Sequence, residues 1–418
     1  MRTVTKSTLI RIRTGGAQAL LLSMSLFFTT SVMQANAAEL FNPEEKVETQ
    51  PNLIAIQQNA IDDMRQRLQR LEQRGQQGED HGVPTSAETA EDTRPQFGVN
   101  LGVFGDINYS SKNREREHQA FSIGDLDFYS TAEYGARINL LAELLLELEE
   151  GGENILDLER LWVGYTFSDL LILRAGKQHS ALGYWNKTYH HGKQLFLTID
   201  RPFFLAFEDD GGILPVHIVG IELEGAKSFA GMRWKYEMSL GNGPMIDTVG
   251  KVLIPNNTSD NNNSKQIVLR LSSTPARCPG VTLGLFGTTY EVDTTAKAGL
   301  EEAILGADLS YLNSGWEFIS EYFRLRNSQD HADAFYIQLG YTLFEVMTPY
   351  ARYEYLNLHP ADPYFMDLQN NSDRDQQIFG LRYEIDHLRS SLKVQYRRDD
   401  KKGAKTFNMT EAQWSFGF

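Results

Sequence analysis

Cysteine, positive charge and long apolar runs are all scarce in this chain. Among 418 residues the one cysteine is Cys278, which excludes an intramolecular disulfide framework and a cysteine-rich metal domain. Lys and Arg number 40 and Asp and Glu number 55, so the formal net charge is −15. Nucleic-acid phosphates require a basic surface, and we therefore exclude nucleic acid as a partner.

Apolar runs in the body of the chain are too short for membrane-spanning helices. A transmembrane helix needs roughly 18 or more consecutive apolar residues. The nearest candidate, residues 140–148, is interrupted by Glu143 and Glu147. If the mature chain lies in a membrane, it crosses that membrane as strands.

The N-terminus has the features of an export signal. Basic side chains at positions 2, 6, 11 and 13 precede an apolar stretch at 17–32, and the small-residue sequence Ala35-Asn36-Ala37 follows it. This order predicts a secretory signal peptide over residues 1–37. An uncleaved anchor is the alternative, but the apolar stretch is short for a bilayer core of about 30 Å.

Residues 38–96 are predicted to form a periplasmic helical leader and linker. The helical part lacks Pro and Gly, and Ile54, Ile61 and Leu68 recur every seven residues, as in a short coiled coil. A single amphipathic helix lying on another surface is the alternative. Residues 75–94 are rich in Gly, Gln, Glu, Thr and Ser, a composition typical of a flexible linker.

The body of the chain, residues 97–418, alternates apolar and polar residues with the period of a β-strand. Long polar connections are interleaved with short turns. We predict an all-β fold, a transmembrane antiparallel β-barrel of about 16 strands, because closure satisfies every backbone donor in lipid. The predicted strands are 97–109, 120–131, 136–149, 156–167, 169–178, 216–226, 228–241, 265–273, 281–290, 302–311, 315–326, 332–344, 347–357, 376–386, 388–398 and 410–418.

A soluble all-β sandwich is the alternative to a membrane barrel. Its strands are usually about 5 to 6 residues long, whereas many of the predicted strands have ten or more. The last strand also places Trp414, Phe416 and Phe418 on one face, and the chain ends on that aromatic residue. A terminal aromatic strand resembles the signature by which barrel-assembly machinery recognises outer-membrane proteins. We therefore expect the bacterial outer membrane as location and its lipid as a partner.

Several short motifs resemble those of one porin superfamily. They are LRAGKQ at 173–178, GIELEG at 220–225, GLRY at 380–383 and QYRRD at 395–399. In this respect the chain is similar to Gram-negative porins of the phosphate-selective porin O/P superfamily. The resemblance implies a homotrimer of sixteen-stranded barrels whose third external loop narrows the channel. It does not by itself imply phosphate as the solute.

The connection 179–215 is by far the longest, and its glycines and prolines suit a loop that folds back into the lumen. Carried over from the resemblance, it is the candidate constriction loop, with a mixed charge set of Lys187, His190, His191, Lys193, Arg201, Glu208, Asp209 and Asp210. Its aromatic residues are predicted to pack the loop against the wall; they are Tyr184, Trp185, Phe203, Phe204 and Phe207.

Alternation also predicts which charged side chains line the pore wall. The basic members are Arg137, Arg160, Arg174, Arg233, Arg352, Arg382, Arg389, Lys393 and Arg397, joined by Lys235 and Arg270. Acidic residues on the same faces nearly balance them. This departs from the arginine ladder and lysine cluster that phosphate selection requires in the superfamily, so we predict weak selectivity. A phosphate- or anion-selective porin is kept as the alternative.

The preferred function is a passive diffusion channel for small hydrophilic or ionic solutes, with no cofactor and no enzymatic activity. An outer-membrane barrel enzyme or anchor is the alternative from another class. Such a hydrolase needs a serine beside a histidine, and His179-Ser180 is the adjacent pair in the loop, with no nucleophile motif around it. The candidate ligands His190, His191, His217 and the acidic run 208–210 lack metal-binding spacing, so we expect no metal site.

Overall fold

The computed structural model describes residues 97–111, 119–148, 154–189, 192–254 and 259–418. The predicted signal peptide 1–37 and the leader and linker 38–96 lie outside the described residues. The strands of the first half are β1 (Phe97–Ser110), β2 (Ala120–Tyr134), β3 (Ile138–Leu148), β4 (Asn154–Ser168), β5 (Leu171–His179), β6 (His217–Phe229), β7 (Met232–Asn242), β8 (Ile246–Asp247) and β9 (Val252–Leu253). Those of the second half are β10 (Lys265–Pro275), β11 (Val281–Val292), β12 (Leu300–Asn313), β13 (Trp316–Asn327), β14 (His331–Tyr341), β15 (Met347–Asn357), β16 (Arg374–Ile385), β17 (Ser390–Lys401) and β18 (Phe407–Gly417).

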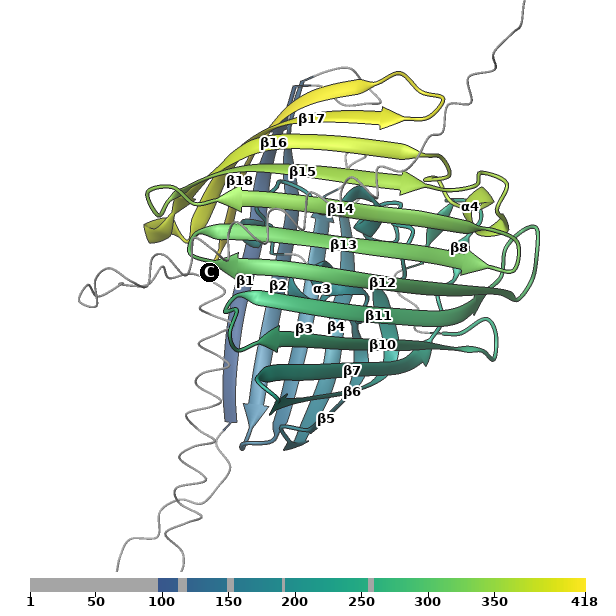
Figure 1. The fold of residues 1–418 in the computed structure, drawn as a ribbon, viewed down its shortest axis with the longest axis horizontal. Coiled ribbons are helices and arrows are strands. Elements are labelled where there is room, and N and C mark those ends of the chain that lie inside the picture. Colours follow the sequence, from purple (N-terminus) through teal and green to yellow (C-terminus); the bar gives the residue numbers. More distant parts are fainter. Residues whose placement is uncertain (1–96, 112–118, 149–153, 190–191, 255–258) are drawn as a thin grey trace, which may run out of the picture. The chain divides into compact units, whose positions relative to one another are not determined.

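Sixteen of these strands form one closed antiparallel barrel (Figure 1). Each pairs with its neighbours in the chain, except that β7 pairs with β10, because β8 and β9 form a separate two-stranded sheet between them. β1 closes the barrel on β18, with Phe104 opposite Gly417 and Ser110 opposite Glu411. The predicted sixteen-stranded antiparallel barrel is confirmed. Closure leaves no free edge of unpaired backbone groups.

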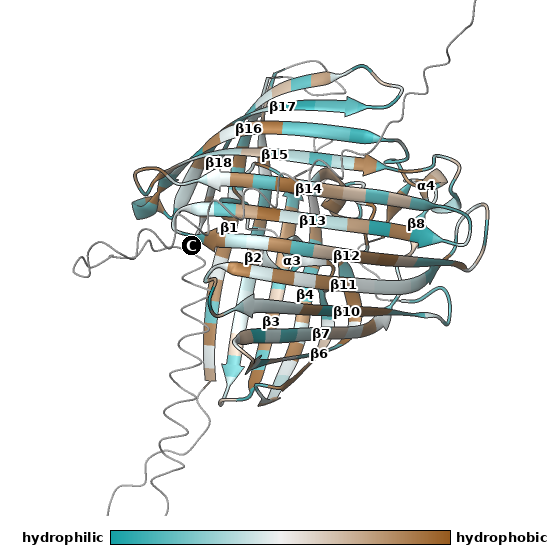
Figure 2. Cartoon of the chain, viewed as in Figure 1, coloured by the Kyte–Doolittle hydropathy of each residue, from teal (hydrophilic) through white to brown (hydrophobic). Residues whose placement is uncertain are grey.

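The two faces of the sheet differ in polarity, as β10 shows. Ile267, Leu269 and Leu271 point outward, with exposed fractions of 39%, 52% and 46%, whereas Gln266 and Arg270 on the inner face are 0% and 8% exposed. Figure 2 shows the same alternation along many strands. A barrel that spans a lipid bilayer has this distribution, with apolar side chains outside and polar ones inside. In the part of the chain described, no helix has the length and apolarity to cross a membrane.

The two ends of the barrel differ in the length of their connections. At one end the turns are short, as at Ala230–Gly231 and Ser314–Gly315, where both residues of each turn have positive φ. Such two-residue turns match the twist of the paired strands. At the other end lie the long connections 180–216, 243–264 and 358–373.

The structure adds elements that alternation did not predict. β8 and β9 lie in the connection between β7 and β10, and the short helix α4 (Pro363–Met366) lies in the connection between β15 and β16. Both connections were predicted as polar loops without secondary structure. Asp362 begins α4 by accepting a hydrogen bond from the backbone N–H of Tyr364 at 2.8 Å. These elements are too short to produce a periodic pattern in the sequence.

A second difference concerns the inner wall. Alternation predicted charged side chains along the inner wall, yet β11 to β14 turn large apolar side chains inward, among them Phe286, Ile304, Ile319 and Phe323. These side chains are 0% to 5% exposed because the segment between β5 and β6 packs on them. One side of the barrel interior is therefore a dry core rather than a wetted wall.

Candidate functional site

The segment 180–216 leaves β5 and folds into the barrel as α3 (Gly183–Thr188), η1 (Lys193–Leu195) and η2 (Phe203–Leu205). We call it the inserted loop. α3 begins against β13, where the backbone N–H groups of Tyr184 and Trp185 each donate to the Glu321 carboxylate at 2.8 Å. Gly183 adopts φ +83°, and a Cβ at that position would meet Glu321 Oε2 at 1.9 Å. The loop enters the lumen here because glycine permits both the backbone angle and the close approach.

Aromatic side chains fasten the inserted loop to the apolar side of the wall. Trp185 and Phe204 are 0% exposed, and Phe203 and Phe207 are each 8% exposed. The Phe204 ring lies 5.7 Å from the ring of Phe323 on β13. The prediction that these aromatics pack the loop against the wall is confirmed. Each buried ring contributes on the order of 2 kcal/mol, so the set holds the loop firmly.

An ion pair on β15 binds the backbone of the inserted loop. Arg352 and Glu354 side chains are both fully buried, and Arg352 Nε donates to Glu354 Oε1 at 2.7 Å. Arg352 Nη1 also donates to Thr198 Oγ1 at 2.6 Å and to the Asp200 carbonyl at 2.8 Å. Glu354 Oε2 accepts from the backbone N–H of Phe203 at 2.6 Å. The pair therefore satisfies both kinds of backbone group on the loop.

Arg382 on β16 binds the backbone of residues 194–196, just before the segment that Arg352 binds. Its guanidinium donates to the carbonyl oxygens of Gln194 at 2.6 Å and of Leu195 and Phe196 at 3.2 Å each. It also forms an ion pair with Glu384 on its own strand. The three carbonyl oxygens thus accept hydrogen bonds from a charged donor. Such bonds are roughly twice as strong as those between neutral groups.

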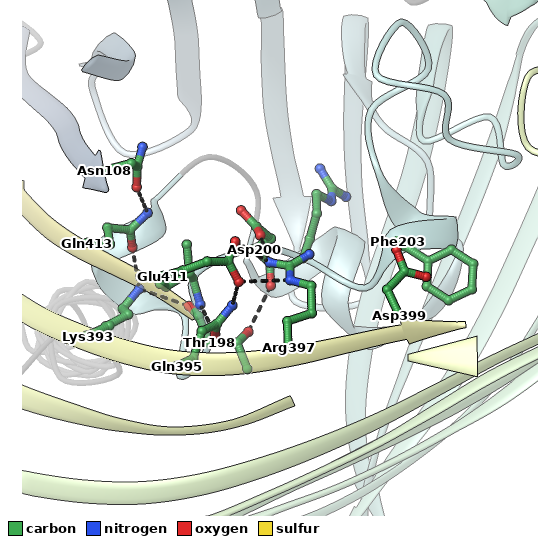
Figure 3. Close-up of polar contacts among 12 residues, drawn as sticks. Asn108, Thr198, Asp200, Phe203, Lys393, Gln395, Arg397, Asp399, Glu411 and Gln413 are labelled. Atoms are coloured by element: carbon green, nitrogen blue, oxygen red, sulfur yellow. Dashed lines mark hydrogen bonds and ion pairs between the residues drawn. The ribbon is translucent and has the colours of Figure 1, made fainter. Parts of the chain in front are cut away.

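Lys393 on β17 likewise binds backbone carbonyl oxygens of the inserted loop (Figure 3). Its ammonium donates to the carbonyl oxygens of Lys193 at 2.5 Å and Thr198 at 3.0 Å, and to Gln413 Oε1 at 2.9 Å. The Lys393 residue is 1% exposed. A predicted pore-wall cation is thus buried beneath the loop.

Arg397, further along β17, is held by two carboxylates (Figure 3). Its Nε donates to Glu411 on β18 at 2.8 Å, and its Nη2 forms an ion pair with Asp200 of the loop. Gln395, on the same face, accepts the backbone N–H of Ile199 at 3.1 Å. The inserted loop is therefore anchored along β15, β16 and β17 by charged and amide side chains.

On the far side of β18, strands β1 and β2 also contact the loop. Lys193 Nζ lies 2.8 Å from Asp125 and 3.3 Å from Asp106. These three side chains are 22%, 29% and 2% exposed, so the first two reach the solvent in the lumen. This bridge joins η1 to β1 and β2.

Further ion pairs lie on β3 to β7. Arg174 Nη1 lies 2.8 Å from Glu222, and its Nη2 lies 2.5 Å from Glu224. Lys187 of α3 lies 3.1 Å from Glu222 and 3.3 Å from Glu237. Arg160 on β4 pairs with Glu143 on β3. Positive and negative charges are closely matched on this part of the wall.

The last part of the inserted loop combines buried and exposed charges. Arg201 is 8% exposed and its guanidinium lies 4.1 Å from the Phe207 ring centre; burial lowers the pKa of Arg201 to about 10. Glu208 accepts hydrogen bonds from the backbone N–H and the ring Nδ1 of His217, both at 2.9 Å. Asp209 is exposed as a residue. Partial desolvation of its carboxylate, together with the neighbouring Asp210 and Glu208, raises the pKa of Asp209 to about 7.

The structure places most of the predicted site residues inside the barrel. Among the loop residues, Lys187, Lys193, Arg201, Glu208, Asp209 and Asp210 are described, whereas His190 and His191 lie outside the described residues. Of the predicted wall cations, Arg160, Arg174, Arg352, Arg382, Lys393 and Arg397 contact inner-wall or loop groups. Arg233 lies beside the Ala230–Gly231 turn and is exposed.

Two predicted wall residues lie elsewhere. Arg137 is in the turn between β2 and β3 and donates to the Tyr165 hydroxyl at 3.4 Å. Arg389 follows η3 (Asp386–Leu388), has φ +45° and is exposed. Alternation extended the strands through positions where the backbone turns, so both residues sit at the short-turn end instead of on the wall.

The contacts of Glu354, Glu321 and Gln395 with loop backbone groups were not predicted. Alternation places such residues on the inner face, but no local pattern tells which of them meets a loop more than a hundred positions away. Ser180, weighed as a nucleophile, is 0% exposed and donates to the Pro215 carbonyl at 2.7 Å. Within the described part of the chain, no group of three or more His, Cys, Asp or Glu side chains is arranged to hold a metal ion.

A closed sixteen-stranded antiparallel barrel with a long loop inserted in its lumen is the fold of outer-membrane porins. Solved structures share it. The outer membrane channel DcaP of Acinetobacter baumannii matches with a TM-score of 0.51 and 10% identity, over 80% of this chain and 100% of that one. An anion-selective porin from Comamonas acidovorans matches with a TM-score of 0.50 and 12% identity, over 77% and 100%.

OmpT, an outer membrane protein of Vibrio cholerae described in a trimer form, matches with a TM-score of 0.50 and 12% identity, over 77% of this chain and 99% of that one. At these identities the likeness establishes the fold. No protein-family model and no curated protein matches the sequence. The porin-like barrel is thus shown, and the narrower superfamily stays a prediction.

Proposed function

We propose that this protein is a porin of the bacterial outer membrane, a passive diffusion channel for small hydrophilic or ionic solutes. One observation carries the proposal. The inserted loop packs on β11 to β14, is hydrogen-bonded to β15 to β17, and forms ion pairs with β1, β2, β6 and β7. Inward charged side chains on β2, β4 and β5 are still partly solvent-accessible: Asp125, Arg160 and Arg174 are 29%, 24% and 20% exposed. A loop folded inside a closed barrel narrows the lumen, and the accessible side chains mark the wall that stays wetted.

Weak selectivity follows from the pairing of charges. Arg174, Lys187 and Arg270 are each bound to carboxylates of the barrel wall, so they present little net field to a passing solute. The resemblance to the phosphate-selective porin O/P superfamily and the anion-selective porin among the structural neighbours favour an anion channel instead. Burial of Arg352 and Lys393 beneath the loop weighs against that alternative.

Assembly and partners are part of the same proposal. The apolar outer face suits outer-membrane lipid, and the terminal Phe418 suits recognition by the barrel-assembly machinery. Neighbours of the same fold include a trimer form, which supports a homotrimer. The predicted signal peptide 1–37 supplies the export route.

Reconstitution of the purified, detergent-folded protein into planar bilayers tests the proposal. We expect stepwise current increases of uniform size that persist at constant voltage. A folded protein that inserts but never conducts would overturn the proposal. Hydrolysis of lipid or ester substrates that is lost in Ser180→Ala would favour the enzyme alternative.

A further inference from the structure

We infer that the outer surface of the barrel carries a binding site for the phosphate group of an outer-membrane lipid, where β13 turns into β14. The inference deepens the lipid contact named under the proposed function and rests on the outer-membrane location proposed there. It is independent of the solute that crosses the channel, because the site faces away from the lumen.

The site is a pocket of about 470 Å³, which we call the β13–β14 pocket. Its lining consists of the consecutive residues from Arg326 to His331, together with Arg324. Phe323 and Leu325 alternate with the two arginines and are 0% exposed, so they point into the barrel. Since neighbouring side chains on a strand point to opposite faces, Arg324 and Arg326 point outward. The pocket therefore belongs to the outer surface.

The β13–β14 pocket lies at the level where lipid headgroups are expected. Because successive strands are antiparallel, it is at the same end of the barrel as the inserted loop and the other long connections. In bacterial outer-membrane barrels that end is extracellular. Leu305, opposite Arg324 on β12, and Tyr322, two residues further in on β13, are 68% and 41% exposed. The apolar outer face thus begins directly beside the pocket.

Basic side chains supply donors for a phosphate. Within the described residues, the exposed Arg326 side chain forms neither a hydrogen bond nor an ion pair. Arg324 is 48% exposed and lies 3.8 Å from Asp333, which is too long for a hydrogen bond. Lys297 donates to the Ser328 hydroxyl at 3.3 Å and so brings a third cation to the pocket. Guanidinium groups bind phosphate oxygens with paired N–H donors, and lysine adds a point charge.

The acidic side chains of the pocket rim already have other partners. Asp333 accepts a hydrogen bond from the Tyr322 hydroxyl. Asp330 Oδ2 lies 3.2 Å from His359 Nδ1, and its Oδ1 lies 3.6 Å from His331 Nδ1. These carboxylates therefore do not use the Arg326 donors.

Three further carboxylates lie near the pocket without entering it. Glu302 and Asp362 are 1% and 2% exposed and accept hydrogen bonds from the Asn327 amide, at 3.1 Å and at 2.8 and 2.9 Å. Glu301, exposed on β12, lies one diagonal step along the ladder from Arg326, and the two form no ion pair. An external anion is therefore needed to use the free donors of Arg326.

The surroundings favour a lipid phosphate over a free one. A free phosphate ion gains nothing from the exposed Leu305 and Tyr322 side chains beside the site. A lipid places its acyl chains on that apolar face and its phosphate in the pocket, and basic clusters at a membrane surface attract anionic headgroups. Long arginine side chains also reach readily from the apolar face to the headgroup level.

Binding of diphosphoryl lipid A to the purified mature protein in neutral-detergent micelles, followed by native mass spectrometry, tests the inference. We expect one tightly held lipid A per chain, and Arg324→Gln combined with Arg326→Gln lowers the affinity roughly tenfold or more. Lipid A stripped of both phosphates binds both proteins equally weakly. Equal affinity of the two proteins for diphosphoryl lipid A would overturn the inference. Inorganic phosphate that displaces lipid A at equal concentration would overturn the assignment to a lipid.

Arg233→Gln combined with Arg277→Gln is the matched control. Both arginines are exposed at the short-turn end of the barrel, so the pair removes the same charge at the other membrane surface. Its affinity for diphosphoryl lipid A stays at the wild-type value; an equal loss there would show unspecific attraction and overturn the site.

Planar-bilayer recordings of the same proteins keep the inference separate from the proposed channel. We expect the Arg324 and Arg326 variant to conduct like the wild type. A chain that conducts without phosphate-dependent lipid binding would overturn the inference alone. A chain that binds the lipid and never conducts would overturn the proposed channel alone.

Discussion

Arg352 and Glu354 lie two residues apart on β15 and bind opposite kinds of backbone group on the same loop. The arginine donates to the Asp200 carbonyl at 2.8 Å, and the glutamate accepts the Phe203 N–H at 2.6 Å. Both side chains are fully buried and paired with each other at 2.7 Å. This pair is one of the contacts that position the loop in the lumen.

Loss of the arginine is expected to loosen the loop without opening the barrel. Arg352→Gln leaves the Glu354 carboxylate buried without its partner, a loss of about 3–5 kcal/mol of unfolding free energy. We expect a lower urea midpoint in detergent micelles and noisier, larger single-channel currents. Arg324→Gln is the control, because that side chain is 48% exposed and lies 3.8 Å from Asp333. Equal effects of the two substitutions would show that the buried pair does not position the loop.

Gly183 is expected to be irreplaceable at the entry of the loop. In Gly183→Ala a Cβ collides with the Glu321 carboxylate, which binds the first N–H groups of α3. Gly403 has nearly the same backbone angle, φ +82°, and a Cβ added there would have no other atom within 4 Å. Gly403→Ala therefore reports the backbone strain alone, roughly 1 kcal/mol.

Thermal unfolding in micelles compares the two glycine variants. We expect Gly183→Ala to lose about 1–3 kcal/mol more than Gly403→Ala, since displacement of Glu321 leaves buried N–H groups unpaired. Equal losses of unfolding free energy in the two variants would mean that the loop entry accommodates the displaced Glu321 carboxylate.

Selectivity is expected to depend on pH near neutrality. Partial desolvation of its carboxylate and the neighbouring Asp210 and Glu208 raise the pKa of Asp209 to about 7, with Glu159 adding to the effect. Above this pKa the carboxylate is charged and attracts cations; below it the group is neutral. The permeability to potassium relative to chloride therefore falls as the pH is lowered from 8 to 6.

Reversal potentials recorded across that pH range measure the change. In Asp209→Asn the profile flattens around pH 7. Glu301→Gln, which removes an exposed carboxylate on β12, retains the original profile. A wild-type ratio that stays constant from pH 8 to 6 would contradict the assignment of Asp209 to the conducting path.

The terminal residue is expected to matter for insertion and closure. Phe418 and Val103 exchange backbone hydrogen bonds of 2.9 and 3.0 Å between the chain end and β1. Deletion of Phe418 removes both bonds and the terminal aromatic group, so less folded protein reaches the outer membrane. Phe418→Tyr keeps the backbone bonds and the ring, and its yield stays close to the wild type. Equal yields of all three proteins would remove Phe418 from the assembly route.

The fold was largely predictable because strand faces follow a local rule. Leu269 outside and Arg270 inside are adjacent in sequence, and the period of two separates them. The rule fails where the backbone turns, so Arg137 and Arg389 were placed on the wall in error. It also fails for the apolar inner wall at Phe323, where only the covering loop explains the burial.

The loop contacts could not be predicted for a different reason. Arg382 and Lys393 have the alternation of lumen cations, and nothing nearby in the sequence distinguishes a solute-binding cation from one that binds carbonyl oxygens. Their partners in the inserted loop lie 186 to 200 positions away in the sequence. Only the tertiary fold decides whether such a cation binds a solute or the loop backbone, and here Arg382 and Lys393 bind the loop backbone.

The most direct test of the account asks which side of the sheet meets water. In a Cys278→Ser background, Asp210→Cys places a thiol on the inserted loop and Leu269→Cys places one on the outer face of β10. A charged, membrane-impermeant thiol reagent is applied to channels in a planar bilayer. The account predicts a fall in current for Asp210→Cys and no reaction of Leu269→Cys; rapid labelling of Leu269→Cys with unchanged current through Asp210→Cys would contradict it.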